Sequence, residues 1–190
     1  DISVGSAIAI AGSVVLRVLC GTNSRPDTLQ APILVAFLAC CVVSMLFGAF
    51  NGTLVAVFKI QPMVATLILY TAGRGIAQLV TNGQITYIRV DSFKMAGGYI
   101  GKCPIPTPIF FAIITVLIVY LILKKTALGL YIESVGINGK AARLVGLNST
   151  MIKFLTYVIC GVLAGIAGIV AAAWFVICIV MHQVGGAVLG

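Results

Sequence analysis

Charge is scarce in this chain. Only 8% of its 190 residues are Asp, Glu, Lys or Arg, whereas soluble domains carry about 25%. Hydrophobic residues make up 61% of the chain, and the mean hydropathy is +1.19. This composition excludes an ordinary soluble enzyme and a disordered protein. The net charge of +8 does not indicate nucleic-acid binding, because the basic residues are dispersed between apolar runs instead of gathered on one face.

Residues that build catalytic or metal sites are also scarce. His182 is the only histidine, so a histidine-based metal cluster is excluded. The four acids are scattered and form no pair: Asp1, Asp27, Asp91 and Glu133. The Gly-Lys dipeptide at 139–140 is not a P-loop, because Ser134 stands where its first glycine should be and Ala141 follows the lysine. We therefore expect no enzyme activity, no cofactor and no ATP hydrolysis by this chain itself.

The cysteines have no metal-ligand spacing. Four of the six lie in apolar runs and are expected to be small core residues: Cys40, Cys41, Cys160 and Cys178. Cys20 and Cys103 lie at or near the ends of apolar segments and could pair, but nothing in the sequence requires a disulfide.

Long apolar runs are what the chain has instead. They predict an all-α fold, a polytopic transmembrane helix bundle with about five membrane helices. The expected spans are 2–16, 31–58, 60–80, 105–123 and 154–181. The run 31–58 would be about 42 Å long as a helix and can therefore cross a hydrocarbon core of about 30 Å with tilt. We expect one transmembrane domain over 1–190. Because the chain begins and ends within apolar sequence, we expect it to be partial.

Loop charges predict the orientation. The segment 124–153 contains Lys124, Lys125, Lys140, Arg143 and Lys153 against Glu133. The positive-inside rule therefore places 124–153 in the cytoplasm, and alternation adds Lys59 to that side. Segments 21–30 and 81–102 then lie outside, although 81–102 has three basic residues against one acid.

Small residues recur along the predicted helices at spacings of three and four. Gly161, Gly165, Gly168 and Ala172 form one stripe, and Gly48 and Gly52 repeat the pattern. Such stripes permit close helix packing in membranes, which is the role we expect for them.

Polar side chains interrupt the apolar spans. They are Asn51, Gln61, Thr66, Thr71 and Arg74, and polar groups at this depth usually face a bundle interior or a wet pathway. Arg74 either lines the pathway or extends its side chain to the outer interface. A further hypothesis pairs Arg74 with Asp1 inside the bundle. Pro62 either starts the helix after Lys59 or breaks one; a start is the simpler interpretation.

The segment 124–153 contains more structure than a passive connector needs. Asn138 is a predicted N-cap, and a short helix over 140–145 should end at Gly146. Ala141, Ala142 and Val145 can share one small face, which suits insertion into a groove on another protein. The alternative is a solvated loop.

Four motifs in register resemble the permease of bacterial ABC sugar importers. They are DISVGS at 1–6, GAFNGTLVA at 48–56, KIQPMVATL at 59–67, and ALGLYIESVGIN at 127–138 followed by AARLVG at 141–146. The similarity is to the ribose/galactose/arabinose branch, most closely to galactofuranose-type permeases, and it extends over 1–173.

This resemblance implies a permease subunit that imports a monosaccharide across the bacterial cytoplasmic (inner) membrane. The implied partners are a cytoplasmic ATP-binding subunit, an extracytoplasmic sugar-binding protein, a second permease subunit and membrane lipid, with no nucleic acid. The loop that docks on the ATPase matches Glu133, Gly136, Asn138, Ala141, Ala142 and Gly146. Asp1, Asn51, Gln61 and Thr66 match positions near the translocation pathway.

The sequence departs from the family after residue 173, because 174–190 (WFVICIVMHQVGGAVLG) is apolar where members have an acidic, Asn-containing outer stretch. Two alternatives therefore stand beside the importer. One is a carrier that needs no ATPase, although it would normally need an ionisable residue at mid-membrane, for which only Asp1 qualifies. The other is a truncated membrane fragment that does not transport.

Overall fold

A computed structural model describes residues 1–20, 33–83 and 107–189, with the α7 side chains described as far as Trp174. Within these ranges every regular element is an α-helix, and the remaining residues form turns and short connections. The helices are α1 (Val4–Cys20), α2 (Ile33–Ala56), α3 (Pro62–Thr81), α5 (Thr107–Lys125), α6 (Ala127–Leu144) and α7 (Ser149–Leu189). The predictions for Cys103, for 21–30 and for most of 81–102 lie outside the described residues, as do those for the side chains of Cys178 and His182.

The prediction of about five membrane helices is confirmed. Among the described residues, four helical segments are long and apolar enough to cross a membrane: Leu34–Ala56, Pro62–Thr81, Pro108–Lys125 and Ser149–Trp174. The shorter apolar helix Val4–Leu19 is the fifth. Since these helices carry apolar residues around most of their circumference, they are typical of membrane spans.

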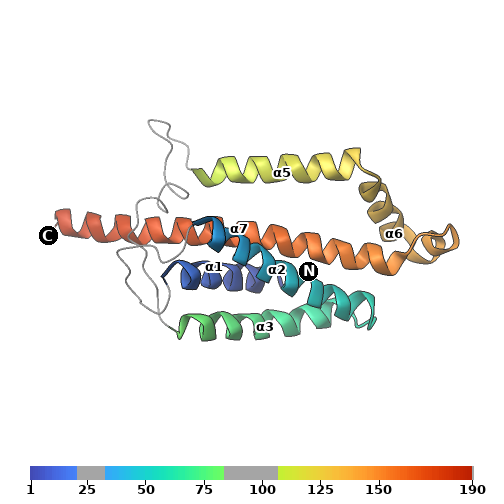
Figure 1. Ribbon diagram of the computed structural model, residues 1–190, viewed down its shortest axis with the longest axis horizontal. Coiled ribbons are helices and arrows are strands. Elements are labelled where there is room, and N and C mark those ends of the chain that lie inside the picture. The colour runs from blue at the N-terminus through green and yellow to red at the C-terminus, as the bar shows by residue number, and fades with distance from the viewer. Residues whose placement is uncertain (21–32, 84–106, 190) are drawn as a thin grey trace.

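All helices except α6, which crosses the others steeply, run roughly parallel or antiparallel to one another (Figure 1). Helices α1, α3 and α7 run in one direction, and α2 and α5 run in the other. One end of the molecule, on the right in Figure 1, therefore gathers the α2–α3 turn, the last turn of α5, α6 and the first turns of α7. We call it the basic end after its cationic residues, which are Lys59, Lys124, Lys125, Lys140, Arg143 and Lys153. The grouping of Lys59 with 124–153 at one end agrees with the prediction from loop charges.

Glycines bring α7 into backbone contact with α2. A Cβ atom built on Gly161 would lie 2.6 Å from the Ser44 carbonyl oxygen and 2.9 Å from the Gly48 Cα. One turn further along α7, a Cβ on Gly165 would lie 2.9 Å from the Ser44 Cβ. These distances leave no room for a side chain, so the predicted packing role of this stripe is confirmed.

The same helix packs on α1 at its next small residues. A Cβ atom built on Gly168 would collide with the Ala11 side chain. A Cβ atom built on Gly12 would lie 3.7 Å from the Ala172 Cβ. Beside this contact lies the core cluster of the bundle, which consists of Ala11, Val15, Leu19, Ala36, Cys40 and Ala173. Helices α1, α2, α3 and α7 form this packed unit, and α5 joins it through α6 and α7.

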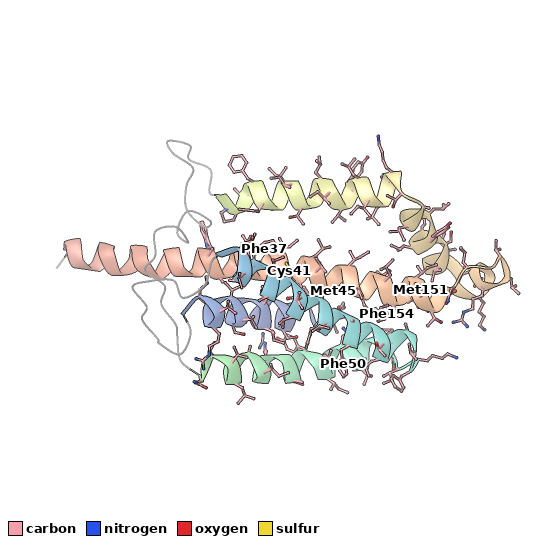
Figure 2. All side chains as sticks on the ribbon, viewed as in Figure 1. Phe37, Cys41, Met45, Phe50, Met151 and Phe154 are labelled. Atoms are coloured by element: carbon pink, nitrogen blue, oxygen red, sulfur yellow. The ribbon has the colours of Figure 1, made fainter. Side chains whose placement is uncertain are left out.

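The outer face of α2 is apolar and exposed. Phe37, Met45 and Phe50 lie along it (Figure 2) and are 39%, 48% and 59% exposed. Apolar side chains on the outside of a helix are the normal surface of a membrane protein, because lipid tails are as apolar as the side chains themselves.

Pro62 begins a helix and does not break one. It is the first residue of α3, and Gln61 is the N-cap residue, whose side chain makes no capping hydrogen bond. The chain leaves α2 through Lys59, which has a positive φ of 56°, and the Ile60 amide donates to the Leu54 carbonyl at 3.2 Å. The prediction of a helix start is therefore confirmed, and the alternative of a broken helix with exposed backbone groups is wrong.

Candidate functional site

A polar cluster connects the start of α1 with α2. The Asn51 Nδ2 donates to the Asp1 Oδ1 at 3.2 Å and to the Ser3 Oγ at 2.9 Å. The Ser3 Oγ and backbone amide in turn donate to the same Asp1 oxygen at 2.6 Å and 2.9 Å. Two of the five predicted pathway residues, Asp1 and Asn51, are thus brought together although 50 positions separate them.

The orientation of the Asn51 amide follows from these contacts. Reversing it would place the Asn51 Oδ1 against the carboxylate oxygen of Asp1, with no hydrogen between them. In the observed orientation the Oδ1 is buried and has no hydrogen-bond partner among the described residues. Asn51 itself is 1% exposed, whereas Asp1 is exposed. The cluster therefore has one exposed carboxylate and one buried acceptor that is still free.

The remaining predicted pathway residues lie elsewhere. Thr66 is buried, but its hydroxyl donates to the Pro62 carbonyl of its own helix at 2.9 Å. Gln61 is exposed at the basic end and lines a cavity between the α2–α3 turn and α6. Thr71, a further polar residue of the spans that is not one of these five, is exposed and bonds its own helix through the Ile68 carbonyl at 2.9 Å. The structure therefore does not assemble all five residues into one site.

The hypothesis that Asp1 pairs with Arg74 is wrong. Arg74 is exposed, and its guanidinium lies 4.4 Å from the centroid of the Tyr70 ring, a cation–π contact. A Cβ atom built on Gly5 would lie 3.7 Å from the Tyr70 ring. This contact places Gly5 of α1 beside Tyr70 of α3, and the two helices run in the same direction. Asp1 and Arg74 are displaced from this contact in opposite directions by four residues each, so about 12 Å of helix rise separates them.

Sequence reasoning missed Ser3 and Ser6 in this region. Ser6 is fully buried, and its hydroxyl donates to the Ser3 carbonyl at 2.8 Å. It also reaches the Leu69 carbonyl of α3 at 3.4 Å. The spacing Asp1-x-Ser3 was an available signal, since an Asp side chain often bonds the backbone two residues further on.

Helix α6 is broken at Asn138, as the predicted N-cap requires. Asn138 has φ −152° and ψ 95°, which are not helical. Its Oδ1 accepts hydrogen bonds from the amides of Lys140 and Ala141, both at 3.1 Å. A short second helical piece follows and ends at Leu144, and the chain turns away at Gly146, whose φ is +90°. The predicted capped helix over 140–145 is therefore confirmed.

Hydrogen bonds hold this short helix against the start of α7. The Ser149 hydroxyl donates to the Gly139 carbonyl at 2.8 Å, and the Arg143 guanidinium donates to the Thr150 hydroxyl at 3.1 Å. Beyond Gly146, the Leu147 amide donates to the Ala142 carbonyl at 3.0 Å. The segment is thus an ordered element and not a freely solvated loop.

The predicted face of Ala141, Ala142 and Val145 needs correction. Ala142 is 6% exposed because it points into the chain, whereas Ala141 and Val145 are exposed. The apolar side chains that the segment presents are instead Ile137, Leu144 and Val145, which are 80%, 90% and 83% exposed. We call these three residues the apolar tip. Glu133, Gly136, Asn138 and Gly146, which the resemblance also assigned to the coupling loop, are exposed.

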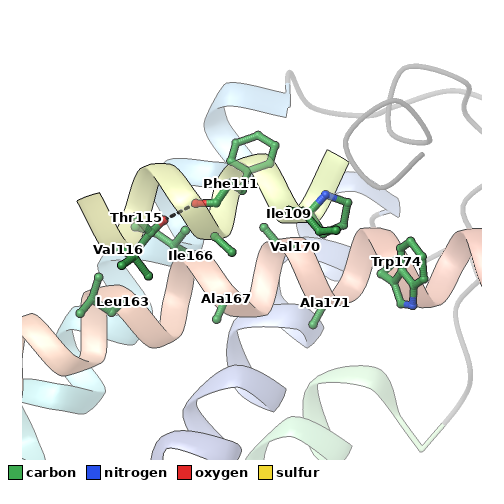
Figure 3. Close-up of a pocket in the computed structure, with 12 residues that line it drawn as sticks. Ile109, Phe111, Thr115, Val116, Leu163, Ile166, Ala167, Val170, Ala171 and Trp174 are labelled. Carbon is green, nitrogen blue, oxygen red and sulfur yellow. Dashed lines mark hydrogen bonds between the residues drawn. The ribbon is translucent and has the colours of Figure 1, made fainter. Parts of the chain in front are cut away.

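A cavity of about 580 Å³ lies between α5 and α7 (Figure 3). Phe111, Val116, Leu163 and Trp174 are among its lining residues. Its Thr115 hydroxyl donates to the Phe111 carbonyl at 2.8 Å, so its proton is already used (Figure 3). Since a sugar needs hydrogen-bond partners for its hydroxyls, this apolar cavity is not suited to hold one.

Comparisons with known proteins agree on one family. The family described as "Branched-chain amino acid transport system / permease component" matches residues 1–185. The galactofuranose transporter permease protein of Escherichia coli (strain K12) is 44% identical over 173 residues, covering 91% of this chain and 48% of that protein. The fructose import permease protein of Bifidobacterium longum (strain NCC 2705) is 38% identical over 182 residues, covering 91% of this chain and 47% of that protein.

The ribose import permease protein of Escherichia coli (strain K12) is 32% identical over 176 residues, covering 91% of this chain and 52% of that protein. The chain therefore spans about half the length of the curated relatives it matches. No solved structure gives a significant match.

Proposed function

The chain belongs to the family of branched-chain amino acid transport system permease components, and from this premise we propose that it is the membrane subunit of an ATP-driven monosaccharide importer. The observation that carries the proposal is the similarity to sugar permeases over 91% of the chain. Because the named relatives carry galactofuranose, fructose and ribose, the substrate class is a monosaccharide and not one particular sugar. The chain is a multi-pass protein of the inner membrane.

The partners we propose are a cytoplasmic ATP-binding subunit, an extracytoplasmic sugar-binding protein and a second permease subunit. ATP is bound and hydrolysed by the first of these, and the chain itself uses no cofactor. The basic end faces the cytoplasm in this proposal, as the positive-inside rule predicts.

The apolar tip is the surface we assign to the ATP-binding subunit. Its three large apolar side chains are at least 80% exposed and lie at a charged end of the protein. Their exposure to water is costly, so they suit contact with a protein partner. The predicted coupling residues have two roles in this proposal. Asn138, Ala142 and Gly146 hold the short helix in shape, Ala141 lies on it, and Glu133 and Gly136 precede it.

Asp1 and Asn51 remain our candidates for the translocation pathway. Their cluster offers a carboxylate and a free amide oxygen, both of which can accept hydrogen bonds from sugar hydroxyls. A conformational change would be needed to expose Asn51.

The test is recovery of the ATP-binding subunit. The tagged protein, expressed at its full native length, is isolated from native membranes, and whatever co-purifies is identified. We expect an ATP-binding subunit in the wild type and a loss of roughly tenfold or more in the Leu144→Ser/Val145→Ser variant, since a central contact residue contributes more than about 1 kcal/mol. Val57→Ser is the control, because Val57 is also apolar, 57% exposed and at the basic end.

Three outcomes would contradict the proposal. Equal recovery of the ATP-binding subunit by the wild type and by the Leu144→Ser/Val145→Ser variant would show that the apolar tip is not part of the interface. Sugar uptake that survives ATP depletion but collapses with the ion gradient would favour the ATP-independent carrier. A protein that inserts but recovers no partner and carries no sugar would favour the non-transporting fragment.

A further inference from the structure

A second cavity lies at the basic end. It is separate from the polar cluster and shares only Ile137 with the apolar tip. It measures about 630 Å³, is open on one side, and is lined by residues of the α2–α3 turn, the second part of α6 and the start of α7. These three elements meet at the right-hand end of Figure 1. Three segments that are far apart in the sequence therefore line one cavity: 55–62, 137–143 and 149–153.

Four cations line this cavity. Lys59 comes from the α2–α3 turn, Lys140 and Arg143 come from α6, and Lys153 comes from α7. No carboxylate accompanies them among the described lining residues. Like charges that converge on one space repel each other, and an anion in that space would remove the repulsion.

Two further features make the cavity favourable for an anion. Gln61 and Pro62, at the start of α3, belong to its lining, and the Gln61 side chain makes no capping hydrogen bond to this helix. The positive end of that helix dipole therefore adds to the field of the four cations. Arg143 is held in place by its hydrogen bond to the Thr150 hydroxyl, and Thr150 also lines the cavity.

The usual excess of basic residues at one membrane face does not account for this arrangement. Lys124 and Lys125, at the end of α5, are such residues, and they do not line the cavity. The positive-inside rule requires cations near the ends of helices but does not require them to converge. Four cations from three separate elements around one cavity need a further explanation.

The surroundings of Lys59 indicate where the anion comes from. Its neighbours Val57, Phe58 and Ile60 are apolar and are 57%, 68% and 39% exposed, so the cavity borders the part of the surface that contacts lipid. Basic pockets between membrane helices bind anionic head groups. We propose that this cavity binds a phosphate group, supplied by the head group of an anionic phospholipid.

The experiment compares two lipids that differ in charge. The purified chain in neutral detergent is titrated with phosphatidylglycerol and, separately, with phosphatidylcholine, and bound lipid is counted by native mass spectrometry. Two double variants remove cavity charges: Lys140→Gln/Arg143→Gln and Lys59→Gln/Lys153→Gln. The control Lys124→Gln/Lys125→Gln removes the same charge at the same end of the molecule but outside the cavity.

We expect phosphatidylglycerol to bind in preference to phosphatidylcholine. Each cavity variant should weaken phosphatidylglycerol binding by roughly 30-fold, since each cation near a membrane surface contributes about fivefold in affinity, and the control should leave it unchanged. The second variant keeps the experiment decisive if the first fails to fold, because Lys59 and Lys153 are not needed for the Arg143–Thr150 bond. Competition by inorganic phosphate at millimolar concentration would support the phosphate site but assign it to the free ion.

Two results would overturn the proposal. The first is equal binding of the two lipids by the wild type, or an equal loss in the control and in both cavity variants, since either would show that no specific site exists. The second is that neither lipid binds at the cavity, whereas an acidic peptide added in the same assay binds in a way that depends on the same four cations. That result would assign the cavity to a protein partner.

Discussion

Helices α5 and α7 are both apolar enough to cross a membrane, yet they have opposite surroundings. In α7, Gly161, Gly165 and Gly168 lie against the backbones or side chains of α1 and α2. In α5 there is no glycine, and none of its span is buried. Apolarity therefore predicts that a helix enters the membrane, and the small residues decide whether it packs inside the bundle, because lipid competes equally well for a large apolar side chain.

The largest expected effect comes from filling the α2–α7 contact. Gly161→Leu should destabilise the bundle by about 3 kcal/mol or more, because even a Cβ at this position would lie 2.6 Å from the Ser44 carbonyl oxygen. The free energy of unfolding is measured in mixed micelles of mild detergent and sodium dodecyl sulfate. Ala112→Leu in α5 is the control, and Ala112 is exposed. An equal loss in both variants would contradict the contrast between the two helices.

An intermediate effect should follow from emptying the core. Leu19 is 0% exposed and Leu117 of α5 is 57% exposed. Leu19→Ala should cost about 2 kcal/mol through the cavity it leaves, while Leu117→Ala should cost almost nothing because lipid fills the space. The same unfolding measurement compares them. A loss at Leu117 as large as that at Leu19 would show that α5 packs against a further element.

The smallest expected effect concerns polar side chains. Asn51→Ala removes two hydrogen bonds between α2 and the start of α1 and should cost about 1 kcal/mol, the usual value for such bonds in membranes. Thr115→Val in α5 removes a hydroxyl that bonds only its own helix. We expect no measurable change for it. If Asn51→Ala leaves the free energy of unfolding unchanged, the polar cluster contributes no stability, and transport is its remaining role.

The sequence predicted much of the fold because its signals are local. The start of α3 at Pro62, the N-cap at Asn138 and the end of the short helix at Gly146 each depend on backbone preferences of one or two residues. The stripe from Gly161 to Ala172 was also predictable, since its spacing places these residues on one helix face.

Prediction was weaker where two elements had to be placed relative to each other. Ala142 was assigned to an exposed face, but the turn at Gly146 folds the segment back so that Ala142 is 6% exposed and Leu144 is 90% exposed. Opposite charge favoured the pairing of Asp1 with Arg74, but the register of α1 and α3 separates them by about 12 Å.

The sequence by itself determined that this chain crosses the membrane about five times, where most of its helices begin and end, and which family it resembles. Only the tertiary structure decided that Asn51 meets Asp1 and Ser3, that Leu144 and Val145 are outermost, and that four cations surround one cavity. The physical reason is that apolarity and capping act along one helix. The way in which helices with uniformly apolar faces cross one another depends on packing between segments far apart in the sequence.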